Sequence, residues 1–168
     1  MSIVIHIPPV AWLLNHQAFI WGLWGLNLVG LFLHYFFQKN KKKQWAEQQK
    51  NLADLKNMSW KQFEQLVAHA FVKQGWKTEM WGQGGADGGI DLVIRKSSTK
   101  GIVQVKHWKG RVGAPIVREQ YGLMHHHKVS VCYIVALGGF TKEAVEFSKG
   151  KSIVLIDGQR LIQLIQGS

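Results

Sequence analysis

The residues best suited to chemistry lie in two short segments between residues 82 and 111. Asp91 follows a glycine-rich stretch, and Gln104 and Lys106 stand two residues apart in an apolar run. Side chains alternate between the two faces of a strand, so Gln104 and Lys106 should share the face opposite their valine neighbours. If the two segments pair as a hairpin, a carboxylate, an amide and an ammonium group meet at one place.

This combination of groups suits metal-assisted hydrolysis of a phosphodiester. Mg²⁺ prefers carboxylate, carbonyl and water oxygens, which Asp91, the Gln104 side chain and the Val105 carbonyl could supply. Lys106 could position the attacking water and offset charge on the phosphate. We therefore expect Mg²⁺ as the cofactor, with Mn²⁺ as a substitute.

The elements that must position these groups are strands. Residues 90–95 and 102–107 read as two strands joined by a Ser-Ser-Thr-Lys-Gly turn, and residues 76–81 as a strand before them. In the first strand of the hairpin, the alternation places Ile90 on one face with Leu92 and Ile94, and Asp91 on the opposite face beside Val93.

A helix is predicted before the strands. Ser59 begins a capping-box pattern, with Gln62 three residues later, and Gly75 ends the helix. Glu64 lies on the border of the apolar stripe, where a buried carboxylate needs a partner. Periodicity alone leaves two partners open, a basic side chain or a metal ion.

The rest of the chain alternates helices with buried strands. Pro115 suits the first turn of a helix, residues 129–137 and 153–156 read as buried strands, Thr141 caps the helix between them, and residues 161–165 begin a last helix. The order is helix, three strands, helix, strand, helix, strand, helix, which indicates an α/β fold. The only cysteine, Cys132, falls inside the first of these apolar runs and reads as a small buried residue.

The sequence Gly-Gly-Ala-Asp-Gly-Gly-Ile-Asp-Leu, followed by Gln-Val-Lys-His-Trp-Lys, resembles the catalytic hairpin of Mrr-type restriction endonucleases, a branch of the PD-(D/E)xK nuclease superfamily. The resemblance covers residues 60–165 and implies a restriction-endonuclease-like mixed β-sheet flanked by helices. It implies Asp91, Gln104 and Lys106 as the active-site core; this branch often has Gln where other nucleases of the superfamily have Glu. It also implies that Glu64, in its Phe-Glu context, joins the metal site.

Basic residues follow the expected catalytic lysine. Lys109 and Arg111 lie in a glycine-containing loop, and Arg118 lies in the next helix. We expect all three to contact DNA phosphates, although an ordinary solvated surface would have the same composition. Gln120, near the buried face of that helix, could orient a water molecule in the active site.

The charge of the chain is strongly uneven along its length. Lysine and arginine total 21 against 10 acidic residues, a net charge of +11 over 168 residues, and no charged residue precedes Lys39. Such an excess suits a polyanion, either nucleic acid or an anionic lipid surface.

The uncharged beginning of the chain predicts a membrane anchor. After a lead of residues 1–16, residues 17–37 would span about 31 Å as a helix, close to the hydrocarbon thickness of a bilayer. The lysines that follow, in a basic juxtamembrane stalk of residues 38–57, place the nuclease domain of residues 58–168 in the cytoplasm, at a bacterial inner membrane. A cleaved signal peptide and a buried core helix are the competing interpretations. Asn27 could hydrogen-bond to the same helix of a second copy, which leaves a homodimer open.

Two functions follow from these patterns. The first is a membrane-anchored, Mg²⁺-dependent DNA endonuclease, with a role in restriction or defence against foreign DNA. The second is a catalytically inactive nuclease-fold module that binds DNA or a partner at the membrane, because a basic surface attracts polyanions with or without chemistry. An intact catalytic set favours the first.

Overall fold

The computed structural model describes residue 24 and residues 27–39, 51–81 and 89–167 of the chain. It divides into two compact units, residues 1–44 and residues 45–168, which we describe separately. In the first unit, residues 27–39 form a helix.

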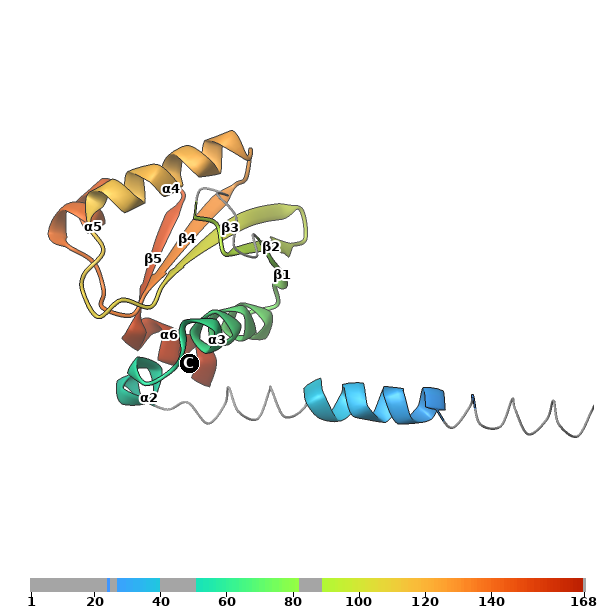
Figure 1. The fold of residues 1–168 in the computed structure, drawn as a ribbon. Helices are drawn as coiled ribbons and strands as arrows, with labels where there is room; N and C mark the ends of the chain where they lie inside the picture. Colours follow the sequence, from blue (N-terminus) through green and yellow to red (C-terminus); the bar gives the residue numbers. More distant parts are fainter. Residues whose placement is uncertain (1–23, 25–26, 40–50, 82–88, 168) are drawn as a thin grey trace, which may run out of the picture. The chain divides into compact units, whose positions relative to one another are not determined.

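The described part of the second unit is built on one five-stranded mixed sheet (Figure 1). The elements in chain order are α2 (Leu52–Lys56), α3 (Trp60–Lys73), β1 (Lys77–Met80), β2 (Leu92–Lys96), β3 (Thr99–Lys106), α4 (Ala114–His126), β4 (Val131–Ala136), α5 (Lys142–Ser148), β5 (Ile153–Asp157) and α6 (Gly158–Gln166). The strands lie side by side in the order in which they occur in the chain. From α3 onward this is the element order that the sequence predicts, and the mixed sheet agrees with the fold class that the resemblance implies.

The sheet combines an antiparallel half with a parallel half. β1, β2 and β3 pair antiparallel, whereas β3, β4 and β5 pair parallel. Parallel neighbours need a crossover, and α4 and α5 supply the two crossovers. The carboxyl ends of β3, β4 and β5 therefore lie along one edge of the sheet.

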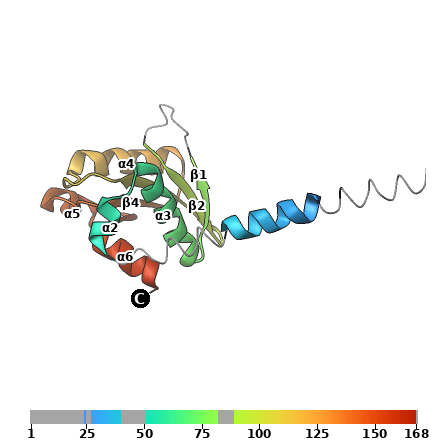
Figure 2. The same cartoon turned by 60° about the horizontal axis from the view of Figure 1, so that its bottom comes forward.

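Helices cover both faces of the sheet (Figures 1 and 2). On one face, α2, α3 and α6 pack over a core that includes Phe63, Leu92 and Val105. On the other, α4 and α5 pack over a core that includes Ile102 and Ile134. Each central strand is thus buried on both sides, which explains its nearly continuous apolar sequence.

The helix α3 begins where the capping pattern places it. The Ser59 hydroxyl accepts a hydrogen bond from the Gln62 N–H, and the Gln62 side chain accepts one from the Ser59 N–H at 2.8 Å. Its buried face carries Phe63, Leu66 and Val67, so the apolar stripe docks the helix on the sheet. This helix brings Glu64 to the site.

Two local predictions about the hairpin are wrong. The turn between β2 and β3 is shorter than predicted, because Thr99 already pairs with Lys96. Ile90 does not share a face with Leu92; it precedes β2 and packs in the core under α4 and α5. The strand alternation starts only at the first residue of the strand, so it could not be extended back to Ile90.

The end of the predicted stalk belongs to the folded unit. The side chain of Asn51 caps α2, and Leu55 is fully buried against the core of the domain. His107, directly after β3, contacts the Leu55 carbonyl with its Nε2 atom at 2.8 Å. Its ring packs against Phe63 at a tilt of 41°, with ring centroids 4.8 Å apart. Residues 40–50 of the stalk lie outside the described residues.

The predicted membrane span is described only in part, since residues 17–23, 25 and 26 lie outside the described residues. Among the residues that are described, no helix combines the length and the apolar character needed to cross a bilayer. The anchor at residues 17–37 therefore stays a prediction.

Candidate active site

Asp91 lies at the centre of the site, immediately before β2. Its main chain extends the antiparallel ladder, because its N–H donates to the Val103 carbonyl at 3.0 Å and its carbonyl accepts from the Trp81 N–H at 2.9 Å. Its side chain accepts hydrogen bonds at Oδ2 from the Val105 N–H, at 2.6 Å, and from the Gln104 side-chain amide. The hairpin that the sequence predicts thus does bring Asp91 to Gln104.

Glu64 reaches the same place from α3. Its side chain is 7% exposed and shares a hydrogen bond with Asp91. Burial, followed by the charge and hydrogen bond of Asp91, raises the pKa of Glu64 to about 7. The pKa of Asp91 is also raised, chiefly by burial, although the Val105 N–H and the Lys106 ammonium act in the opposite direction. Periodicity left a basic side chain and a metal ion open as partners of Glu64; the side chain that it meets in the structure is a second carboxyl group, that of Asp91.

Lys106, at the end of β3, is the fourth residue of the site. The side chain is half-buried, and its positive charge is near enough to lower the pKa of Asp91. Its Nζ atom also lies 5.1 Å from the ring centroid of Trp108. The structure therefore groups Glu64, Asp91, Gln104 and Lys106, as the sequence and the resemblance led us to expect.

Gln104 is oriented differently from a metal ligand. It is buried, and its Nε2 atom points to Asp91 Oδ2 and to the Val105 carbonyl, 3.4 Å away. Its Oε1 atom accepts a hydrogen bond from Nε2 of Gln120 in α4, at 3.0 Å. The side-chain oxygen that we expected to face a metal ion thus faces the helix.

The oxygen donors of the site fit a hard cation. Two carboxyl groups, Glu64 and Asp91, lie together with raised pKa values, so a cation would relieve the cost of ionising both. The described residues contain no group of three or more His, Cys, Asp or Glu side chains that could hold a metal. The pair of carboxyl groups, Glu64 and Asp91, suits Mg²⁺ better than Zn²⁺, because Mg²⁺ keeps several waters and needs only one or two carboxylates.

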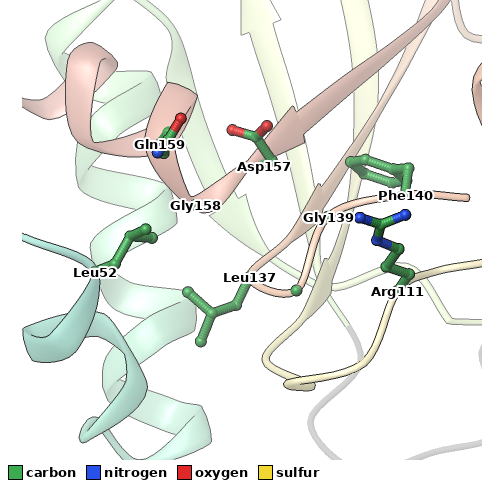
Figure 3. A pocket seen from close by; sticks show the side chains of 9 residues that line it. Leu52, Arg111, Leu137, Gly139, Phe140, Asp157, Gly158 and Gln159 are labelled. Carbon is green, nitrogen blue, oxygen red and sulfur yellow. The ribbon is translucent and has the colours of Figure 1, made fainter.

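The three predicted DNA-binding residues are exposed and lie on two different elements of the chain. Lys109 and Arg111 follow β3, whereas Arg118 lies on α4, its guanidinium carbon 5.4 Å from the ring centroid of Phe147 in α5. Arg111 lines a pocket of about 470 Å³ at the carboxyl ends of β4 and β5 (Figure 3). In this view its guanidinium group extends toward Phe140.

The loop after Lys106 is fixed to the wall of this pocket. The Val112 N–H donates to the Gly139 carbonyl at 2.9 Å. A Cβ atom on Gly138 would overlap the main chain of Lys109 and Gly110, so only glycine allows the loop to pack so closely. Main-chain contacts therefore hold the loop that carries Lys109 and Arg111 near the end of β3.

Two contacts of the site were not predicted. Gln120 was expected to orient a water molecule, but its Nε2 atom donates to Gln104 and to the Gly89 carbonyl. His107 joins the end of β3 to α2. The only sequence signal for either was a polar residue within an apolar pattern, which does not identify the partner.

A mixed sheet whose antiparallel hairpin carries an aspartate, an amide and a lysine, with a glutamate from the preceding helix beside them, is typical of restriction-endonuclease-like folds. The family comparison agrees: the family model described as "Restriction endonuclease" (Mrr_cat) matches residues 55–165. Because the match covers more than half of the chain, the protein belongs to this family and carries a nuclease domain. The resemblance to Mrr-type enzymes is confirmed.

Two solved structures share the fold. The DNA modification-dependent restriction endonuclease AspBHI aligns with a TM-score of 0.57 and 13% identity over 76% of this chain and 35% of its own. The protein of unknown function AF1548 aligns with a TM-score of 0.50 and 17% identity over 61% of this chain and 64% of its own. The chain thus covers less than two thirds of either protein. No curated protein matches.

Proposed function

We propose that this protein is a Mg²⁺-dependent DNA endonuclease. The observation that carries the proposal is the hydrogen-bonded pair of carboxyl groups, Glu64 and Asp91, with Lys106 beside it at the end of β3. Two carboxyl groups are costly to bury together, and a divalent cation is the partner that makes such a pair useful for phosphodiester hydrolysis.

Each residue of the site has a role that follows from its surroundings. Glu64 and Asp91 would hold Mg²⁺, with the Val105 carbonyl as a neutral donor. Val105 N–H fixes the Asp91 carboxylate, and Lys106 orients the attacking water and offsets the charge that develops on the phosphate. When bound, Mg²⁺ supplies Lewis-acid polarisation of the phosphate and a more acidic water.

DNA is the substrate that the charge of the chain supports. The net charge of +11 suits a polyanion, and the exposed Lys109 and Arg111 follow the catalytic strand at a distance of a few residues. The description of the family model as a restriction endonuclease supports a role in restriction or defence.

We further propose that the beginning of the chain anchors the enzyme in the bacterial inner membrane. In the helix of residues 27–39 the apolar side chains are exposed all round, among them Leu28, Leu31 and Phe32. A helix that is apolar on every side suits lipid better than water. Separation of membranes from cytosol tests this part, and recovery of the full-length protein in the soluble fraction at low salt would contradict it.

Plasmid cleavage tests the enzymatic part of the proposal. The full-length protein in mild detergent should nick or linearise supercoiled plasmid with Mg²⁺ or Mn²⁺ and should be inactive with EDTA. Asp91→Asn should lose at least about a hundredfold in rate, since it removes a metal-binding charge. Glu79→Gln, an exposed carboxyl on β1, is the charge-matched control. Cleavage in EDTA would exclude the proposed mechanism, and DNA binding without cleavage would favour the inactive binding module.

A further inference from the structure

Two buried glutamines lie behind Asp91 and form a continuous chain of hydrogen bonds. Gln104 is 2% exposed and Gln120 is 1% exposed. The Gln120 Nε2 atom donates to the Gly89 carbonyl at 3.3 Å and to Gln104 Oε1 at 3.0 Å. Gln104 Nε2 in turn donates to Asp91 Oδ2 and to the Val105 carbonyl. The chain therefore runs from a turn, through α4 and β3, to the central carboxylate.

The acceptors at the two ends decide which way each amide points. The oxygen and nitrogen of a glutamine side chain have nearly the same shape, so their assignment depends on the hydrogen-bond partners. A main-chain carbonyl can only accept, so the end of Gln120 at Gly89 must be its NH₂ group. The neighbouring end of Gln104 must then be its oxygen. The far end of Gln104 is NH₂, which agrees with the two acceptors, Asp91 and Val105, that it meets.

Gly89 allows the main chain to approach both glutamine side chains closely. Its φ of +83° lies in the left-handed region, which favours glycine. A Cβ atom at this position would overlap Gln104 Oε1 and lie 3.3 Å from Gln120 Nε2. The turn before β2 thus approaches both amides at a point where no other side chain could be placed.

We propose that Gln120 is a positioning residue of the active site: anchored on the Gly89 carbonyl, it holds Gln104 with its NH₂ group toward Asp91. Gln104 then acts as a donor that fixes the Asp91 carboxylate together with the Val105 N–H, rather than as an oxygen ligand of the cation. This role rests on the proposed function, because it presumes that Asp91 binds the cation. Residues that orient a metal ligand commonly contribute ten- to a hundredfold to metal affinity.

Gln120→Met tests the proposal, because methionine has a similar length and no strong donor. In the full-length protein, the affinity for Mn²⁺, followed by the electron paramagnetic resonance signal of the free ion, should fall about ten- to a hundredfold. Val117→Ala is the matched control, since Val117 is fully buried in the same helix and packs in the core under α4. It should destabilise the protein while changing Mn²⁺ affinity far less.

The same substitution in a Gln104→Glu variant separates the effect of Gln120 on the orientation of residue 104 from its effect on packing. Gln104→Glu replaces the amide with a carboxylate, whose two oxygens are equivalent, so no partner has to set its direction. Gln120→Met should therefore cost a smaller factor in Mn²⁺ affinity in the Gln104→Glu background than in the wild-type background. An equal factor in both backgrounds, or an unchanged affinity in the wild-type background, would overturn the proposal.

The metal-free wild-type protein supplies a readout that depends on neither activity nor a variant. If Gln104 points as described, its NH₂ protons lie beside the Val105 N–H, because both donate to Asp91 Oδ2. A nuclear Overhauser effect between these protons is expected, and its absence would overturn the proposal. If the effect is present but the wild-type protein neither binds Mn²⁺ nor cleaves DNA, the orientation of Gln104 is correct and the proposed function is wrong. Gln120 would then position Gln104 without a role in metal binding.

Discussion

Glu64 and Asp91 share a side-chain hydrogen bond that joins α3 to the β2–β3 hairpin. The contact brings together two acidic groups that are 27 residues apart in the chain, and burial is the largest cause of the raised pKa of each. A hydrogen bond between two carboxyl groups requires a proton on one of them. Below the Glu64 pKa of about 7, the metal-free site therefore keeps a proton that a divalent cation would displace.

Because of this proton, we expect the free energy of unfolding of the metal-free protein to depend on pH. The pKa of Glu64 is about 7 in the folded protein and 4.5 as its ordinary value. Between these values the folded state binds more protons than the unfolded state, so the free energy of unfolding falls as the pH rises through this window. The fall should be on the order of 3 kcal/mol between pH 4.5 and 8. Urea denaturation with EDTA at several pH values measures it.

Substitution identifies the group responsible. Glu64→Gln should flatten the dependence between pH 4.5 and 7, because glutamine has no proton to lose. Glu79→Gln, which removes an exposed carboxyl group on β1, should leave the slope as it is. The assignment to Glu64 is excluded if the two variants have the same slope.

Lys106, the last residue of β3, and Lys109, in the loop that follows, should have separable effects. Lys106→Met should lower the cleavage rate about 10²- to 10⁴-fold, the range for a group that assists proton transfer, with little change in DNA affinity. Lys109, exposed on the loop, should instead act through phosphate contact, so Lys109→Met should weaken DNA binding and lower the salt slope by about 1. Cleavage at saturating DNA and filter binding at several salt concentrations distinguish the two. Equal loss of DNA affinity in both variants would contradict a catalytic role for Lys106.

The predictable parts of this structure are those that depend on local pattern. The capping box at Ser59 gave the first residue of α3, and alternation in β3 correctly placed Gln104 opposite Val103 and Val105. These features depend on neighbours a few residues away, so the sequence contains them in full. Gly89, by contrast, is required by contacts with residues from β3 and α4.

The parts that were not predicted depend on how deeply elements dock. Gln120 is one polar residue on an amphipathic helix, and nothing in that pattern indicates that it reaches Gln104 across the interface between α4 and the sheet. α2 has only five residues and lies at the end of a Lys- and Gln-rich segment with scattered apolar residues, so a stalk was the natural interpretation. Only tertiary packing of Leu55 shows that the segment belongs to the domain.

The single thiol offers a direct measure of global unfolding. Cys132 is fully buried in β4, and burial raises its pKa to about 12. The thiolate is the reactive form, so a disulfide reagent at pH 8 should react with the native protein only when it opens. The labelling rate should therefore rise with urea in parallel with unfolding followed by circular dichroism. Fast labelling without urea would contradict the burial of Cys132.

The final prediction concerns the contribution of α2 to the nuclease domain. Leu55 is fully buried, and its carbonyl is bound by His107, the residue next to Lys106. Leu55→Ala should lower the free energy of unfolding by about 2–5 kcal/mol, because it leaves a cavity under a short helix. Lys56→Ala, an exposed neighbour in the same helix, should change it by less than about 0.5 kcal/mol.

His107 connects α2 to the site, because it contacts the Leu55 carbonyl and directly follows Lys106. Loss of α2 would free the main chain directly after Lys106, so Leu55→Ala should also lower the cleavage rate at a temperature where the protein remains folded. Thermal unfolding and plasmid cleavage, measured on the same samples, test both parts. If Leu55→Ala is as stable as Lys56→Ala, α2 does not pack on the domain as described, and the folded nuclease begins at α3.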